Sequence, residues 1–207
     1  MMPGSADKSF EDHRGVTAVD GATKARIERA AVTLFARQGI DAVTTRAIAA
    51  GSGVSEGAIY RYYHSKNALA EELFYALHHR LAADIRDAGA LPSIADQARA
   101  IVSAYCHAAD DDWSLFAYHL LNAHRFLSDP ARKGEKKENN PVAETERLIM
   151  SAMANGEIPQ GDAALKSAMV LGVVMQTALH KIYGRISGDL SAHKEVLEKA
   201  VLGILEN

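Results

Sequence analysis

The chain has 207 residues, of which 48% are apolar and 24% are charged, and its formal net charge is −3. This composition excludes a disordered chain, and the length allows either one helical domain or a small and a larger module. No run of about 18 uncharged apolar residues occurs, so we expect no membrane-spanning segment. The single cysteine, Cys106, cannot form an internal disulfide, and we expect a cytoplasmic location.

The charge is distributed unevenly along the chain. Residues 23–70 hold seven basic and three acidic side chains, whereas residues 71–207 hold 14 basic and 19 acidic ones. The positive charge is therefore concentrated in one N-terminal segment. This asymmetry favours nucleic acid as the partner of that segment and keeps the rest of the chain away from it.

The first predicted helix follows an irregular tail. Residues 1–22 mix glycine, serine and charged residues without any period, which predicts a disordered tail. From Thr23 to Gly39, apolar residues such as Ile27, Ala31 and Phe35 recur at helical spacing. We expect this helix to be the floor on which the next two helices rest.

Two short helical patterns separated by a tight turn lie between Thr44 and Lys66. Thr44 can cap the first helix and Ser55 the second, because each hydroxyl can accept a bond from an unpaired backbone N–H group. Gly53 and its neighbours break the first helix, since glycine reaches the positive φ values of a sharp reversal. The second helix is expected from Glu56 to about residue 62. Two short helices in this arrangement place the second one in a DNA groove.

The rest of the chain predicts helices only. The helix from Lys66 to Ala88 is expected to be about 35 Å long at 1.5 Å per residue, and its length suits a connection between two modules. Further along the chain, the stretch 128–141 is charged, which predicts a solvated loop. The remaining predicted helices are Ser93–Ala109, Asp112–Leu127, Val142–Asn155, Asp162–Ile186 with Asp162 as its cap, and Ser191–Leu205 with Ser191 as its cap.

The stretch around the tight turn resembles the helix-turn-helix of the TetR family of bacterial transcriptional regulators. The residues that carry the resemblance are Thr44-Thr45, Ile48-Ala49, Gly53-Val54-Ser55, Gly57, Ile59-Tyr60, Tyr63, Ser65-Lys66 and Leu69. The resemblance covers about Thr23 to Leu81, and beyond that it is one of architecture. It implies an all-α fold, in which an N-terminal three-helix helix-turn-helix domain (23–83) is joined by a long fourth helix to a C-terminal helical ligand-binding and dimerisation domain (84–207).

The resemblance also implies which residues bind DNA. Thr45, Tyr60, Tyr62 and Lys66 match positions that contact phosphates in the family, and Gly57 matches the position of closest backbone approach. Glu56, Ala58 and Arg61 would read bases or lie beside them, because their side chains suit cytosine, thymine and guanine respectively. Arg46 and Ser55 complete the predicted DNA-binding set. The chain departs from the family where Tyr62 and Tyr63 replace the usual His-Phe, and we expect Tyr63 to be a core residue.

The last two predicted helices are too apolar for a monomer surface. The simplest arrangement is a four-helix bundle shared by two subunits, as in TetR-like proteins. Burial of both helices inside one subunit is the alternative. The predicted interface residues are Leu165, Met169, Gly172, Leu179, Val196, Val201 and Leu205.

A small-molecule pocket is predicted around His124. This histidine lies on the apolar stripe of its helix, where its ring needs a polar partner. It either bonds to a neighbouring group or lines a ligand cavity. The pocket residues would be Tyr105, Phe116, His124, Met150, Met153 and Gln176.

No metal, cofactor or catalytic site is expected. His78 and His79 are adjacent and point to different helix faces, while His119 and His124 have a poor spacing for metal ligation on one helix. We therefore expect a non-enzymatic homodimer that binds double-stranded DNA at an inverted-repeat operator and is released by a small apolar or amphipathic effector. Two alternatives remain open, namely a bundle that docks a protein, and a helical enzyme with a DNA-binding head.

Overall fold

The structure, a computed structural model, describes residues 21–127 and 139–207, and within these ranges the regular elements are all helical. The predicted tail at 1–20 and the charged stretch 128–138 lie outside the described residues. The elements are α1 (Gly21–Gln38), α2 (Thr45–Ser52), α3 (Glu56–Tyr62), α4 (Lys66–Ala88), α5 (Ile94–Asp111), α6 (Trp113–Leu127), α7 (Pro141–Ala154), α8 (Ala163–Ile182), the 3₁₀ helix η2 (Leu190–His193) and α9 (Lys194–Glu206). The predicted all-α fold class is confirmed.

Local capping explains where several helices begin. The hydroxyls of Thr44, Ser55 and Ser65 accept bonds from the third backbone N–H group that follows each of them, at the starts of α2, α3 and α4. Asp162 caps α8 in the same way. Gly53 ends α2 with a left-handed φ of 66°, which turns the chain sharply into α3. The predicted caps at Thr44, Ser55 and Asp162 are thus confirmed.

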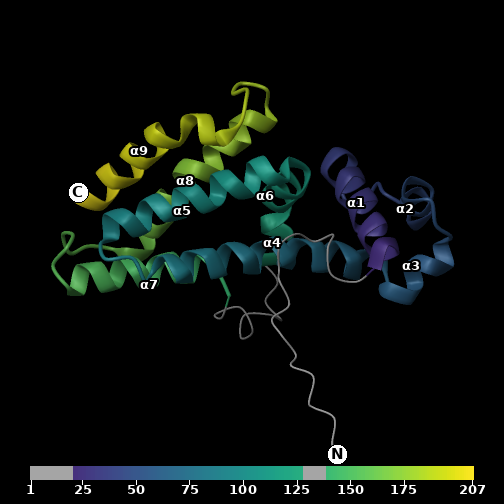
Figure 1. Cartoon of the computed structure of the whole chain (residues 1–207), viewed down its shortest axis with the longest axis horizontal. Coiled ribbons are helices and arrows are strands. Elements are labelled where there is room, and N and C mark those ends of the chain that lie inside the picture. Colours follow the sequence, from purple (N-terminus) through teal and green to yellow (C-terminus); the bar gives the residue numbers. More distant parts are fainter. Residues whose placement is uncertain (1–20, 128–138) are drawn as a thin grey trace, which may run out of the picture.

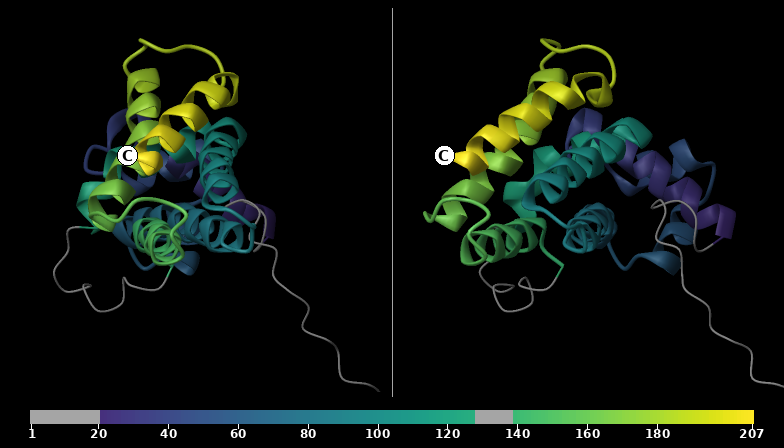
Figure 2. Two further views of the ribbon diagram at one scale, coloured as in Figure 1. Left: turned by 90° about the vertical axis from the view of Figure 1, so that its left-hand side faces the viewer. Right: turned by 60° about the vertical axis from the view of Figure 1, so that its left-hand side comes forward.

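The helices form a small head and a larger body. Helices α1, α2 and α3 gather at one end of the molecule, and α4 begins beside them and continues along the body (Figure 1). In the body, α4 packs on α5, α6 and α7, while α8 and α9 lie side by side on the outside (Figure 2). One continuous core runs from Ile27 and Phe35 in the head to Val201 in α9.

Several predicted boundaries differ from the structure. Helix α1 begins at Gly21 and not at Thr23, and α8 ends at Ile182 because Gly184 takes a left-handed φ of 70°. Ser191 does not cap the last helix. It lies within η2, where its backbone N–H and hydroxyl both donate to the carboxylate of Asp110. This carboxylate holds η2 against the end of α5, so α9 begins only at Lys194.

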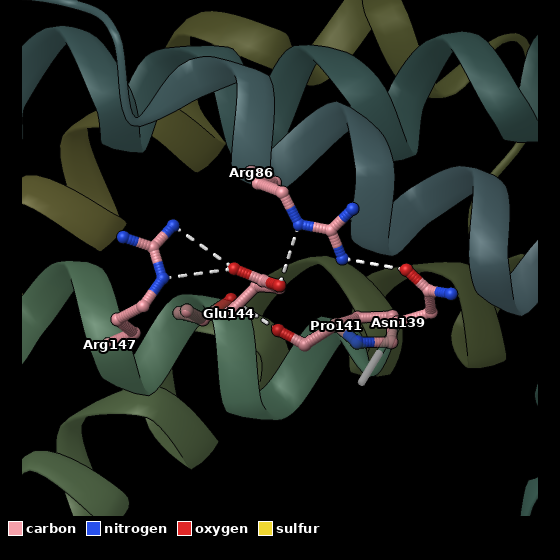
Figure 3. A network of polar contacts seen from close by, with 6 residues as sticks. Arg86, Asn139, Pro141, Glu144 and Arg147 are labelled. Carbon is pink, nitrogen blue, oxygen red and sulfur yellow. Dashed lines mark hydrogen bonds and ion pairs between the residues drawn. The ribbon is translucent and has the colours of Figure 1, made fainter. Parts of the chain in front are cut away.

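The end of α4 is fastened to the start of α7 by an ion network (Figure 3). The Arg86 guanidinium donates to Glu144 at 2.9 Å and to the side chain of Asn139 at 2.7 Å. Arg147 pairs with the other oxygen of Glu144 at 3.0 Å. The two guanidinium groups balance the negative charge of the Glu144 carboxylate. Their charge-assisted hydrogen bonds hold the C-terminal end of α4 against α7.

Among the described residues, one helix is long and apolar enough to cross a membrane by length and composition alone. This helix is α8, and 33% of its most apolar window is buried. Length and composition are a weak indication by themselves, because core helices pass the same test. Lys166 ties the start of α8 to the body, since its ammonium donates to the carbonyl oxygens of Ile204 and Leu205 in α9.

Candidate nucleic-acid interface and effector site

The outer surface of α2 and α3 presents aromatic and basic side chains. Tyr60 and Tyr62 are 53% and 38% exposed, and Arg61 between them is exposed. The hydroxyls of Tyr60 and Thr45 lie 3.4 Å apart, which places one predicted contact from each helix side by side. Such a surface can donate hydrogen bonds to phosphate oxygens.

The first turn of α3 is open in front of Gly57. A Cβ atom built at Gly57 would meet only the Ser55 hydroxyl, at 3.8 Å, and its backbone angles are not left-handed. The glycine therefore serves no packing contact and no special turn within the protein. The expectation that a DNA backbone passes close to Gly57 stays a prediction, and the open space beside it is compatible with that approach.

Glu56 and Arg46 are paired across the two motif helices. The Arg46 Nε atom lies 3.3 Å from a carboxylate oxygen of Glu56, and the Arg46 side chain is 88% exposed. The carboxylate of Glu56 thus faces a guanidinium group before any DNA is bound. Both side chains stay near the surface that we expect to meet DNA.

Two members of the predicted DNA-binding set are placed differently. Ala58 is only 8% exposed, because it lies beside Ile59 on the inner face of α3, so the expectation that its methyl group touches a base is wrong. Lys66 is held by the protein itself. Its ammonium donates to the carbonyl oxygens of Ile40 and Val43, both at 2.6 Å, and to that of Asp41 at 3.4 Å.

The contacts of Lys66 supply a structural reason for a lysine at the start of α4. The ammonium satisfies carbonyl groups of the loop between α1 and α2, which have no helical partners of their own. The family resemblance assigns this lysine to a phosphate, and the sequence does not reveal its carbonyl partners because they lie 23 to 26 residues away. Its role in DNA binding stays a prediction. By contrast, Tyr63 is a core residue as expected, since it is 2% exposed and its hydroxyl donates to Glu28.

The predicted effector pocket is not assembled as one cavity. Tyr105, Phe116 and Met153 are buried in the body. His124, Met150 and Gln176 are exposed, so the expectation that they line a common pocket is wrong. His124 lies in the last turn of α6 and is exposed there, whereas Leu115 to His119 near the start of the helix are buried.

A different pair of histidines lies in the core between α4 and α6. His78 Nδ1 and His119 Nε2 are 3.3 Å apart, and the two side chains are 5% and 6% exposed. The His119 ring stacks on Phe74 with 4.5 Å between the ring centres. Burial and the neighbouring His78 lower the pKa of His119 to about 3, so its ring is neutral at physiological pH. Sequence spacing could not find this pair, because its members are 41 residues apart.

Among the hollows on the surface of the described residues are two that no residue of the predicted pocket lines. One has a volume of about 520 Å³ and lies between α1 and the end of α2, beside Arg26 and Arg29. The other, of about 640 Å³, lies between the start of α8 and the end of α9, beside Leu165, Met169 and Gly203. In the described ranges, no group of three or more His, Cys, Asp or Glu side chains is placed to hold a metal ion.

The outer face of α8 and α9 carries exposed apolar side chains. Leu165, Met169 and Val196 are 58%, 46% and 70% exposed. Gly172 and Gly203 have open space where a Cβ atom would lie. Val201 and Leu205 are buried within the protomer, at 0% and 2% exposure, so their assignment to an interface between subunits is wrong. Helix α9 packs on both α5 and α8, which accounts for the burial of these two residues within the protomer.

The helix-turn-helix region matches a known family. Residues 27–73 match the family model described as "Bacterial regulatory proteins, tetR family". The chain carries a tetR-family DNA-binding domain. The resemblance expected from the turn residues is thereby confirmed over residues 27–73.

Solved structures share the fold over almost the whole chain. The fatty acid degradation regulator FadR from Bacillus halodurans is 21% identical with a TM-score of 0.72, and the match covers 89% of this chain and 96% of that one. FadR from Bacillus subtilis, solved in complex with stearoyl-CoA, is 19% identical with a TM-score of 0.69 and coverage of 85% and 96%. The ketosteroid transcriptional regulator KstR2 of Mycobacterium tuberculosis is 19% identical with a TM-score of 0.73 and coverage of 92% and 97%. No curated protein matches the chain.

Proposed function

We propose that the protein is a homodimeric repressor, located in the cytoplasm, that binds an inverted-repeat operator and leaves it when a small apolar or amphipathic effector binds to the body. Residues 23–83 are the DNA-binding domain and residues 84–207 bind the effector and the second subunit. The observation that carries the proposal is the exposed aromatic and basic surface of α2 and α3, with its open turn at Gly57.

The exposed apolar face of α8 and α9 supports the homodimer. Large apolar side chains on neighbouring helices, together with small residues between them, suit close packing against a second copy of the same face. A twofold dimer presents two identical α3 helices, and its DNA site is then an inverted repeat.

The apolar or amphipathic class of the effector is supported by the make-up of the body and by the similar folds. Tyr105, Phe116 and Phe74 are buried in the core between α4, α5 and α6, so a cavity that opened there on effector binding would be lined by aromatic rings. One similar structure holds stearoyl-CoA, and another is a ketosteroid regulator.

Selection of bound DNA from a random pool tests the operator. We expect an inverted repeat bound by two chains, and a non-repeated site bound by one chain would overturn the proposal. Stearoyl-CoA and a ketosteroid are then tested for release of the protein from the selected operator. Free coenzyme A is the control for the charged part of stearoyl-CoA. Release by an apolar compound and not by coenzyme A is expected. Release by neither would leave the DNA-binding role and remove the effector class.

A further inference from the structure

Helices α1 and α6 run parallel and in register where the head meets the body. Arg29 in α1 donates to Asp112 at the start of α6 at 2.7 Å. Phe35 stacks on Tyr118 with 5.7 Å between the ring centres. Arg125 in the last turn of α6 donates to both carboxylate oxygens of Asp41, at 3.0 and 2.8 Å. In Figure 1, α6 is the body helix beside α1.

The two ion pairs at the ends of this contact have opposite polarity. At one end the head supplies the arginine and the body the carboxylate, whereas at the other end the body supplies the arginine. Asp112 also accepts the Leu115 N–H at the start of α6, and Arg125 lies near its C-terminus, so both body charges suit the helix dipole. Rotation of the head about the central Phe35–Tyr118 stack would separate both pairs at once.

The loop that Arg125 holds leads directly into the DNA-binding helices. Asp41 lies between the end of α1 and Thr44, which caps α2. The same loop is held from α4 by Lys66 through the carbonyl oxygens of Ile40 and Val43. Proximity of the Arg125 guanidinium lowers the pKa of Asp41, so its carboxylate stays charged through the physiological range. The loop before α2 is thus held by a side chain of α4 and by a side chain of α6.

We propose that Asp41 and Arg125, together with Arg29 and Asp112, are positioning residues that fix the angle of the DNA-binding domain on the body and so set the spacing between operator half-sites that the dimer accepts. This inference rests on the proposed function, because two heads joined through their bodies must reach two half-sites at once. Exposed ion pairs contribute little to stability, and their value here is orientation. Neither pair needs to touch DNA.

The test compares operators that differ only in the spacer between half-sites. Affinity is measured for the selected inverted repeat and for versions lengthened or shortened by one base pair. Asp41→Asn and Arg125→Gln each break the pair but change the net charge in opposite directions. The preference is the ratio of the affinity for the native spacer to the affinity for an altered spacer. We expect each variant to lower this ratio by roughly two- to fivefold, which corresponds to the loss of one surface ion pair. The charge-swapped double variant Asp41→Arg/Arg125→Asp restores the preference.

Arg99→Gln is the matched control, because Arg99 is also an exposed arginine but pairs with Asp96 within the body helix α5. It should leave the spacing preference unchanged. Opposite shifts in overall affinity for Asp41→Asn and Arg125→Gln, with an unchanged preference in both, would overturn the proposal and indicate simple attraction to DNA. A wild-type protein that recognises no inverted repeat would instead overturn the proposed function itself, so the two failures are distinguished.

Discussion

His119 is a titratable side chain enclosed between α4 and α6. Its ring contacts His78 and stacks on Phe74, and only 6% of it is exposed. Placing a cation there is unfavourable, since the charged form loses its hydration and meets no carboxylate in these contacts. The histidine pair therefore makes the stability of the α4–α6 contact depend on pH.

We expect the free energy of unfolding to fall as the pH drops below about 6.5. In the unfolded chain His119 binds a proton near its ordinary pKa of 6.5, whereas in the folded protein it stays neutral down to about 3. The unfolded state then binds more protons, and stability decreases by at most about 1.4 kcal/mol per pH unit from this group. Urea unfolding between about pH 7 and about pH 5 measures the slope.

The variant His119→Phe should flatten that slope, because phenylalanine has no proton to gain. His124→Gln is the control, since it removes an exposed histidine from the same helix. An identical pH dependence in His119→Phe and the wild type would show that another group causes the loss of stability in acid.

Gly57 separates the requirements of the fold from those of DNA binding. A glycine inside a helix is less stable than alanine by about 0.5–1 kcal/mol, and nothing in the protein fills the space beside it. We expect Gly57→Ala to keep or raise the melting temperature. Operator affinity should fall in Gly57→Ala and fall further in Gly57→Val, because a side chain would meet a sugar or a phosphate. Full operator binding by Gly57→Val would mean that this face of α3 does not meet DNA.

Lys66 is expected to stabilise the head through its contacts with the loop carbonyl oxygens. Lys66→Met keeps the length of the side chain and removes the ammonium, which leaves two close acceptors without their donor. We expect a loss of about 1.5–3 kcal/mol in unfolding free energy, the range for hydrogen bonds to charged groups. An unchanged stability in a urea titration would show that the lysine is not needed by the loop.

At the scale of elements, local sequence signals predicted the helix-turn-helix. The contacts that join it to the other helices depend on long-range packing. Thr44 and Ser55 cap their helices through residues three positions away, so their roles are readable in sequence. The partners of Lys66 lie at least 23 residues away, and the partner of Arg125 lies 84 residues away. Such pairs depend on how α4 and α6 pack against the head, and no periodicity reports that arrangement.

The same distinction applies to the last two helices. Their apolar composition indicated burial on more than one side, but periodicity alone does not say which side faces a partner. Val201 and Leu205 turn inward, while Leu165 and Met169 turn outward. His124 shows the same limit for pockets, because its place on an apolar stripe predicted burial and the residue is exposed.

The outer face of α8 is expected to hold the dimer together. Met169→Glu places a charge in the middle of the exposed apolar stripe, where a partner subunit would have to bury it without compensation. We expect the variant to be a folded monomer in sedimentation experiments, with greatly reduced affinity for an inverted repeat. Leu121→Glu is the control, because Leu121 is also exposed, at 48%, but lies on α6. A stable dimer of Met169→Glu would place the interface elsewhere.

At the scale of the whole molecule, charge of opposite sign is separated between head and body. Residues 23–70 carry a surplus of four positive charges, while the chain as a whole has a net charge of −3. Only the head is therefore attracted to the phosphate backbone, and the body is repelled. The attraction is screened by salt, so the number of phosphate contacts can be counted from the salt dependence of binding.

Each subunit offers two exposed arginines, Arg46 and Arg61, on the expected DNA-binding surface, while Lys66 is occupied by loop carbonyl oxygens. A dimer then neutralises about four phosphates, and log K against log salt should have a slope of about −3.6 at roughly −0.9 per phosphate. Arg61→Gln should flatten the slope by about two units, because it removes two cations per dimer. Lys66→Met should leave the slope unchanged, and filter-binding titrations at several salt concentrations distinguish the two variants. If Lys66→Met flattened the slope as much as Arg61→Gln, the ammonium would have to leave the loop for a phosphate when DNA binds.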